Sequence, residues 1–225
     1  MGEMVEFASN GGTAPGYLAT PSGTGPGILV IQEWWGLVPH IKDVCDRFAA
    51  EGFVALAPDL YHGQTTTEPD GAAKLMMAMN MEQAAKDMSG AVDLLRERSG
   101  RDEIGVVGFC MGGGLALVAG TLRPDAIKAV VPFYGVIPWP SAQPDWSQLQ
   151  ASVMGHVAEK DGYFTPEKAQ ELEDTLKGMG KDVQLYVYPD VDHAFFNDDR
   201  PEVYDAAAAG TAWQRTLDHF RAVLG

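Results

Sequence analysis

The segment Gly108-Phe109-Cys110-Met111-Gly112 constrains the fold of this chain more than any other. An apolar, strand-like run at 104–107 precedes it, and a helix-like run from Gly113 follows it. Glycines two positions to either side of one residue are typical of the nucleophile elbow, a sharp strand-to-helix turn with a strained central residue and no room for flanking side chains. Cys110 holds the central position, where serine is usual. The alternative interpretation is a free, buried cysteine beside a tight turn.

Short apolar runs alternate with helix-like segments along almost the whole chain. Continuous apolar runs of four to eight residues are typical of strands that are covered on both faces. The alternation therefore predicts an α/β fold, with a mainly parallel sheet and helices on both of its faces. No repeat or change in composition divides the chain, so 1–225 is expected to form a single domain. The expected strands are 27–31, 53–57, 104–107, 129–134, 152–157 and 183–188, and the expected helices are 40–51, 82–98, 166–177, 204–224 and one from 113 onward.

Four other segments give weaker signals. Residues 4–7 and 17–19 resemble edge strands around a Gly-rich turn. Residues 61–71 are expected to form a loop and 135–144 a Pro-rich excursion, because glycine and proline interrupt regular structure there. A helix-spaced stripe of Leu75, Met76 and Met79 is interpreted as packing.

Charge and composition exclude several classes of partner. The formal net charge is −15 with a pI of about 4.5, and no basic run offsets it, so nucleic acid and anionic membrane surfaces are not expected as partners. No signal peptide or membrane-length apolar run is recognised. A cytoplasmic location is expected, because reducing conditions keep a working thiolate free. Cys45, in the helix predicted at 40–51, is expected to pack in the core.

A thiol nucleophile needs a base, and the base needs an acid that orients it. In parallel α/β sheets such residues follow the carboxyl ends of strands, and in this architecture the acid and then the histidine follow the nucleophile along the chain. Of the five histidines, two precede Cys110 and two lie inside a predicted strand or helix. His193 follows the last strand and is predicted to be the base, the alternative being a solvated loop histidine.

Two carboxylates follow the strand predicted at 152–157. Asp161 is predicted to orient His193, and Glu159 is its close competitor. Asp190 and Asp192 are too near His193 in the chain to reach it from a separate strand end.

The loop after the strand at 27–31 supplies a further part of the expected site. An oxyanion hole of this kind combines the N–H of the residue after the nucleophile with one from an earlier strand's loop. Met111 and Trp34 are predicted to be these two donors. Glu33 is an unusual residue directly after a buried strand; it is either a salt-bridged loop carboxylate or a group that controls when the thiolate forms.

Five motifs taken together resemble the dienelactone hydrolase family, also called carboxymethylenebutenolidases, over nearly the entire chain. The resemblance implies an α/β-hydrolase domain in which Cys110 is the nucleophile, His193 the base and Asp161 its orienting acid. The motifs are Gln32-Glu33-Trp34, Pro58-Asp59-Leu60-Tyr61, Gly108-Phe109-Cys110-Met111-Gly112-Gly113, Asp161-Gly162 and His193-Ala194-Phe195-Phe196-Asn197.

The resemblance also implies a mechanism. A glutamate at the position of Glu33 hydrogen-bonds the resting thiol and moves away when substrate binds. The thiolate attacks the ester carbonyl, an enolate leaves, and water hydrolyses the thioester.

The chain departs from the family at the clamp for the substrate's carboxylate. Two arginines and a serine form this clamp in the well-known members, and this chain has Gly63, Asn197 and Ala194 at the three positions. A buried carboxylate needs cationic or multiple N–H partners. The substrate is therefore expected to depend less on a carboxylate, and Arg200 is expected to cap the start of the last helix. Tyr134 and Asn197 are predicted to lie in the substrate pocket, with ordinary core packing as the alternative for Tyr134.

The predicted function is hydrolysis of small carboxylic esters or lactones through a thioester. No cofactor or metal is expected, because no metal-ligand cluster or phosphate-binding glycine loop is recognised. The oligomeric state is not predicted. Alternatives are a peptidase or acyl transferase with the same triad and a non-hydrolytic small-molecule binding protein; a thiol redox protein lacks a resolving cysteine near Cys110.

Overall fold

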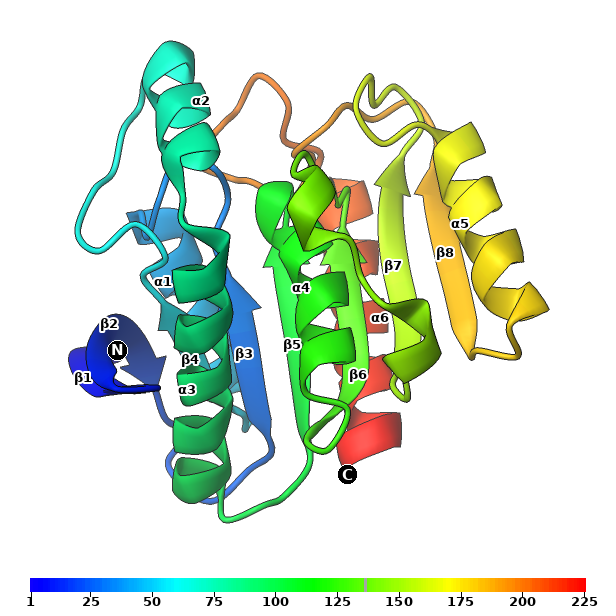
Figure 1. The fold of residues 1–225 in the computed structure, drawn as a ribbon. Helices are drawn as coiled ribbons and strands as arrows, with labels where there is room; N and C mark the ends of the chain where they lie inside the picture. Colours follow the sequence, from blue (N-terminus) through cyan, green and yellow to red (C-terminus); the bar gives the residue numbers. More distant parts are fainter. Residues whose placement is uncertain (136) are drawn as a thin grey trace.

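One eight-stranded sheet, in the order β1-β2-β4-β3-β5-β6-β7-β8, runs through the chain (Figure 1). The computed structural model describes residues 1–135 and 137–225. The strands are β1 Glu3–Ser9, β2 Gly12–Ala19, β3 Gly27–Ile31, β4 Val54–Pro58, β5 Ile104–Phe109, β6 Ile127–Phe133, β7 Ser152–Ala158 and β8 Val183–Tyr188. The helices are α1 Pro39–Ala50, α2 Pro69–Ala78, α3 Met81–Ser99, α4 Met111–Leu122, α5 Pro166–Gly178 and α6 Ala206–Leu224, with 3₁₀ turns at Pro140–Ala142 and Trp146–Gln148.

The strands from β3 to β8 pair in parallel, whereas β1 and β2 pair antiparallel. This arrangement confirms the expected α/β fold with a mainly parallel sheet. One expectation about the N-terminal strands is wrong: β1 is an edge strand, but β2 lies between β1 and β4. The antiparallel pairing of β2 with β4, from Gly16 opposite Pro58 to Ala19 opposite Ala55, depends on a contact about forty residues away, which local sequence does not reveal.

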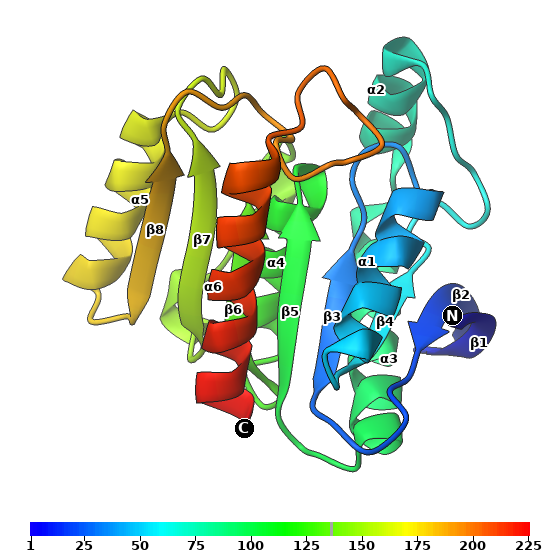
Figure 2. The same cartoon turned by 180° about the vertical axis from the view of Figure 1, so that it is seen from behind.

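Helices cover both faces of the sheet. Helices α3, α4 and α5 lie in front of it in Figure 1, and α1 and α6 lie on the opposite face, in front of the sheet in Figure 2. Every residue of β3, β4 and β5 is buried, as the continuous apolar runs indicated. Because β3 pairs in parallel with both β4 and β5, the carboxyl ends of these central strands lie at the same edge of the sheet, where ligands bind in folds of this kind.

Helix α2 was not expected. It begins with Pro69, a residue suited to the first turn of a helix, and stands at the top of Figure 1, above the carboxyl ends of the strands. Ala72 is its one buried residue, and the stripe of Leu75, Met76 and Met79 is only partly buried against the core, so the segment lacks the broad buried face of a typical helix. The predicted excursion at 135–144 includes the turn Pro140–Ala142, and position 136 within it lies outside the described residues.

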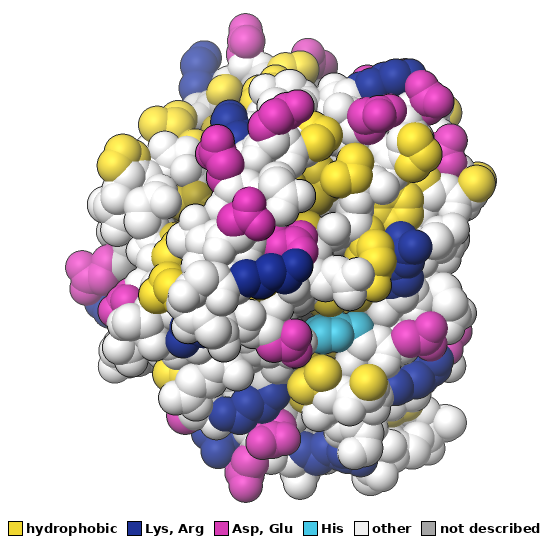
Figure 3. Space-filling view, turned by 90° about the vertical axis from the view of Figure 1, so that its right-hand side faces the viewer, with side chains coloured by type: hydrophobic (Ala, Val, Ile, Leu, Met, Phe, Trp, Pro, Cys, Tyr) yellow, Lys and Arg dark blue, Asp and Glu magenta, His cyan; other side chains and the backbone are white. Residues whose placement is uncertain are grey.

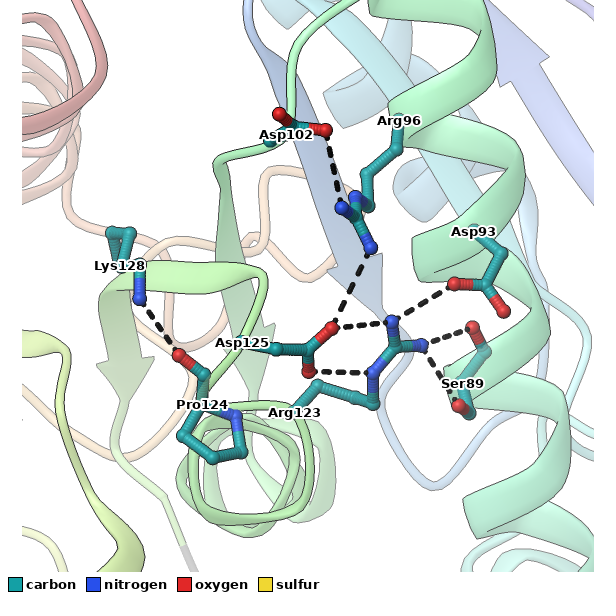
Figure 4. Close-up of polar contacts among 8 residues, drawn as sticks. All are labelled: Ser89, Asp93, Arg96, Asp102, Arg123, Pro124, Asp125 and Lys128. Atoms are coloured by element: carbon teal, nitrogen blue, oxygen red, sulfur yellow. Dashed lines mark hydrogen bonds and ion pairs between the residues drawn. The ribbon is translucent and has the colours of Figure 1, made fainter.

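An ion-pair network lies beside the amino ends of β5 and β6, at the end of the sheet opposite the carboxyl ends of the strands (Figure 4). Arg123, at the end of α4, donates to Asp125 and Asp93 at 2.9 Å and to the carbonyl oxygen of Ser89 at 3.1 Å. Arg96 of α3 joins Asp125 at 3.5 Å. These bonds hold α3 against the turn that leads from α4 into β6.

On the face toward α5 and β8, acidic, basic and hydrophobic side chains are interspersed, so no single charge dominates it (Figure 3). Within 1–135 and 137–225, none of the helices combines the length and the apolar character needed to cross a membrane.

Candidate active site

Cys110 lies at the turn between β5 and α4 with φ 54° and ψ −118°, a strained conformation for a residue with a side chain. The flanking glycines are required by close backbone contacts. A Cβ at Gly108 would lie 1.9 Å from the carbonyl oxygen of Gly112, and one at Gly112 would lie 2.4 Å from that of Ile31. The strand-to-helix elbow read from the sequence is therefore present, and it presents the thiol at the carboxyl end of β5.

His193 connects Cys110 to an acid. Its Nδ1 is 2.7 Å from Oδ2 of Asp161, and Cys110 lines the same pocket as the imidazole. The three residues come from the ends of three different strands, β5, β7 and β8. The structure thus brings together the three residues predicted as nucleophile, acid and base.

The charge state of His193 follows from these contacts. Burial lowers the pKa of His193, but hydrogen bonds and charge interactions with Asp161 and Cys110 outweigh it and raise the pKa to about 10. The imidazole is therefore suited to accept and hold a proton during the reaction.

Asp161 is held rigidly and Glu159 is not part of this cluster. Oδ1 of Asp161 accepts the backbone N–H groups of Tyr163 at 2.7 Å and Phe164 at 3.1 Å, which leaves Oδ2 for His193. Glu159 is exposed, and its carboxylate accepts the N–H of Asp190 at 2.8 Å. Of the two competing carboxylates, Asp161 is the one bonded to His193.

The two predicted oxyanion-hole donors flank the elbow. Met111 is the first residue of α4, so its N–H has no acceptor within the helix. Trp34 lies inside a turn that Gly36 closes by donating its N–H to the carbonyl oxygen of Glu33 at 3.3 Å. The N–H of Trp34 takes no part in that turn bond. Both amides remain available to a substrate oxygen.

Glu33 is fully buried and does not contact the thiol through a hydrogen bond of its own in this structure. Its Oε2 accepts from the side-chain amide of Asn197 at 2.7 Å. Burial raises the pKa of Glu33, and the charge of His40, the bond from Asn197 and the charges of His193 and Arg200 lower it. The thiol bond that the family resemblance implied is thus replaced here by a bond to Asn197.

A pocket of about 390 Å³ opens above Cys110 and His193. Tyr134 is fully buried and packs against His193, with ring centroids 4.9 Å apart. Asn197 lines a neighbouring cavity of about 450 Å³. Neither Tyr134 nor Asn197 lines the pocket of Cys110. Besides Cys110 and His193, its lining residues are Trp34, Trp35, Pro69, Met76, Lys160, Gly162, Tyr163, Asp192, Arg200 and Val203.

Arg200 differs from its expected role. Asp205, not Arg200, caps α6, with its side chain accepting from the N–H of Ala208 at 2.8 Å. Arg200 lies over the ring of Trp35, 5.7 Å from its centroid, and donates to Glu202 at 2.9 Å. The expectation was wrong because several residues separate Arg200 from α6, and stacking on Trp35 directs its side chain to the pocket.

The three altered clamp positions offer little to an anion. Gly63 has φ 93° and donates its N–H to Asp59, and a Cβ added there would meet no atom within 4 Å. Ala194 is 2 % exposed, and the amide of Asn197 is engaged by Glu33.

Sequence reasoning missed several residues near the thiol. Lys160 and Val203 line its pocket, and Met76, which was interpreted as packing, lines it from α2. His40 was set aside because it precedes Cys110 in the chain. Its position at the start of α1, directly after the loop that contains Glu33, could have indicated that it lies near the site.

No group of three or more His, Cys, Asp or Glu side chains suited to a metal ion occurs in the part of the chain that the structure describes. Cys45 and Cys110 are both free thiols, and Cys45 is fully buried in α1.

Comparison with known proteins gives one consistent family. Protein usf of Aquifex pyrophilus is 41% identical over 100% of both chains. A "Putative carboxymethylenebutenolidase" of Aquifex aeolicus is 38% identical, also over 100% of both chains. The crystal structure of a "Putative Dienelactone Hydrolase" of Klebsiella pneumoniae superposes with a TM-score of 0.88 at 28% identity and covers 98% of each chain. Since the model of the dienelactone hydrolase family also matches residues 14–224, the chain belongs to the dienelactone hydrolase family.

Proposed function

We propose that this protein hydrolyses small carboxylic esters or lactones with Cys110 as the nucleophile. Membership of the dienelactone hydrolase family supports ester or lactone hydrolysis. The observation that carries the finer proposal is the 2.7 Å bond between His193 and Asp161, with Cys110 lining the same pocket as the imidazole.

The first half of the reaction forms a thioester. His193 takes the thiol proton, and the sulfur attacks the carbonyl carbon of the substrate. The carbonyl oxygen becomes an oxyanion, which the N–H groups of Trp34 and Met111 stabilise. The tetrahedral intermediate, in which the sulfur is bonded to the former carbonyl carbon, then collapses. The C–O bond to the leaving group breaks, and His193 protonates the departing alkoxide or enolate.

The second half releases the acid. His193 removes a proton from a water molecule, which attacks the thioester carbonyl. The C–S bond breaks, the sulfur takes the proton back from His193, and Asp161 keeps the imidazole in the required tautomer throughout. Glu33, in its carboxylate form, keeps the resting thiol neutral until substrate is bound, because a nearby negative charge in a buried site disfavours a thiolate.

Hydrolysis of p-nitrophenyl acetate by the wild type and by Cys110→Ala tests this function. Cys110→Ala should lose at least about a hundredfold in kcat/KM, since covalent catalysis contributes more than that in comparable triads. Cys45→Ala is the matched control, because it removes the other free thiol from the core. If the wild type binds the ester without hydrolysing it, the protein is a binding protein instead. Full activity in Cys110→Ala would exclude the thiol as the nucleophile.

A further inference from the structure

The motif Pro58-Asp59-Leu60-Tyr61, which begins at the last residue of β4, has no part in the reaction steps above. All four residues are buried. The carboxylate of Asp59 accepts the backbone N–H groups of Tyr61 at 3.1 Å and of Gly63 at 2.6 Å. An aspartate that bonds the backbone two residues further on fixes a tight turn. Leu60 and Tyr61 are therefore held in place at the carboxyl end of β4.

Tyr61 contacts the residue that supplies one of the two oxyanion-hole donors. Its hydroxyl donates to Sδ of Met111 at 3.3 Å, and both side chains are buried in the same apolar cluster. This sulfur is the one hydrogen-bond partner of the hydroxyl in the part of the chain that the structure describes. A thioether is a weak acceptor, but a buried hydroxyl without a partner carries a free-energy cost. The bond thus joins the end of β4 to the first residue of α4.

Leu60, the residue before Tyr61, is bonded to the loop of the other donor. Its N–H donates to Oε1 of Gln32 at 3.2 Å, and Gln32 lies two positions before Trp34. Gln32 is fully buried, and its Nε2 has no hydrogen-bond partner among residues 1–135 and 137–225. Costs of this kind are found mainly at functional sites. Adjacent residues of one turn therefore connect to the two donor loops.

The two donor loops also touch each other directly. A Cβ at Gly112 would lie 2.4 Å from the carbonyl oxygens of both Ile31 and Gln32. The backbone after Met111 is thus in close approach to the backbone before Trp34. An oxyanion hole works only when its donors lie about 2.7–3.1 Å from the developing oxyanion. A displacement of about 1 Å can cost about a hundredfold in rate, so the spacing of these loops matters for catalysis.

We propose that Tyr61 is a positioning residue of the oxyanion hole: its hydroxyl, through the thioether of Met111, fixes the N–H of Met111 relative to that of Trp34. The bond from Leu60 to Gln32 fixes the Trp34 loop from the same turn. This inference rests on the proposed function, in which the two N–H groups stabilise the oxyanion.

The test compares Tyr61→Phe, Met111→Leu and the double variant with the wild type. Tyr61→Phe removes only the hydroxyl, whereas Met111→Leu keeps the backbone N–H and most of the volume but removes the sulfur. Tyr17→Phe is the matched control, because the hydroxyl of Tyr17 is also hydrogen-bonded, to Asp46 at 3.1 Å, but in the apolar cluster on the other face of the sheet.

Three measurements separate positioning from a general disturbance of the site. The first is kcat and KM for p-nitrophenyl acetate. The second is the inhibition constant of an aryl trifluoromethyl ketone, to which the thiol of Cys110 adds to give a tetrahedral oxyanion. The third is the rate at which iodoacetamide alkylates Cys110, a displacement of iodide by sulfur in which no oxyanion forms.

Tyr61→Phe should lower kcat about tenfold with KM within about twofold of wild type, because an interaction made only in the transition state is weakened. The ketone should bind about tenfold more weakly, and the alkylation rate should stay within about twofold. Met111→Leu should behave alike. The double variant should lose no more than the larger single loss, since the two residues act through one bond. Tyr17→Phe should follow the wild type.

Unchanged kcat in Tyr61→Phe, or alkylation that slows in proportion to kcat, would overturn the proposal, as would single losses that multiply in the double variant. If the Tyr61 and Met111 variants do not fold, Gln32→Met, which removes the acceptor of the Leu60 N–H, should lower kcat and ketone affinity with alkylation unchanged. Failure of the proposed function is seen separately, as full activity in Cys110→Ala.

Discussion

At the scale of single residues, Asp161 and Glu159 lie two positions apart after β7 but occupy different environments. The carboxylate of Asp161 is buried and accepts three hydrogen bonds, one of them from the imidazole of His193. Glu159 is exposed and bonds the backbone of Asp190. Substituting either residue by its amide changes the charge equally and alters the shape little, so the pair forms a controlled comparison.

Asp161→Asn should lower kcat/KM for p-nitrophenyl acetate by up to about 10⁴-fold, because an amide favours the wrong tautomer of His193. It should also lower the pKa of His193 from about 10, since one of the two anions that raise it is lost. Glu159→Gln should leave both quantities within about twofold of wild type. Greater damage from Glu159→Gln would show that the acid is misassigned.

The pocket residues lead to a prediction about substrate charge. Gly63, Ala194 and Asn197 provide no free cation, and the guanidinium of Arg200 is bonded to Glu202 and stacked on Trp35. A substrate carboxylate would find no unpaired bidentate partner of the kind that arginine supplies.

Methyl esters of lactone acids should therefore be hydrolysed at least as well as the free acids. The measurement is kcat/KM for a lactone acid and for its methyl ester. A preference for the free acid of a hundredfold, about 2.7 kcal/mol of discrimination, would contradict this expectation. Loss of that preference in Arg200→Gln would then identify Arg200 as the missing cation.

At the scale of elements, the network around Arg123 joins α3, α4 and β6 far from Cys110 (Figure 4). Hydrogen bonds to charged groups contribute about 1.5–3 kcal/mol each, and truncating Arg123 breaks several at once. Arg123→Met should lower the free energy of unfolding by about 2 kcal/mol in urea titrations and leave kcat unchanged. Arg98→Met, at an exposed position of α3, is the control. A fall in kcat of the folded Arg123 variant would show that this network influences the candidate active site at the other end of the strands.

Elements with strong local signals were predictable, and those defined by distant contacts were not. The central strands and α1, α3 and α5 agree with their predicted ranges to within about two residues, because buried runs and amphipathic periods are local properties. Helix α2 was missed because Ala72 is its one buried residue and its apolar stripe is only partly buried. The position of β2 inside the sheet depends on its pairing with β4.

At the scale of the whole molecule, chain order and strand ends were sufficient to bring Cys110, Asp161 and His193 together. The βα topology sends every central strand to the same edge, so residues after different strands converge there. The direction of the Arg200 side chain and the partners of His40 were not predictable, since each depends on side chains from other segments, Trp35 and Asp198. The single domain predicted for 1–225 remains an expectation; unfolding in one transition, followed by tryptophan fluorescence and circular dichroism, would support it.

The stability of the molecule at acid pH should depend on His156 in β7. Thr216 uses its hydroxyl hydrogen on the carbonyl oxygen of Ala212, so its oxygen accepts the Nε2–H of His156 at 3.0 Å. Tyr188 accepts from Arg215 and donates to Nδ1 at 2.9 Å. The buried imidazole is therefore neutral with both nitrogens satisfied, and burial, aided by the charges of Arg215 and His219, lowers its pKa to about 3.

In the unfolded chain this histidine binds a proton near pH 6.5. Between pH 6.5 and about 3 the unfolded state thus holds one more proton at this site than the folded state, so its contribution to stability is complete above pH 6.5 and is lost as the pH falls. The loss should be about 1.4 kcal/mol per pH unit. Urea unfolding at pH 7, 6 and 5 should show this steeper decline in the wild type than in His156→Gln, although the variant is less stable at pH 7 because its buried hydrogen bonds are impaired. Equal slopes in the two proteins would mean that His156 does not titrate on unfolding in this range.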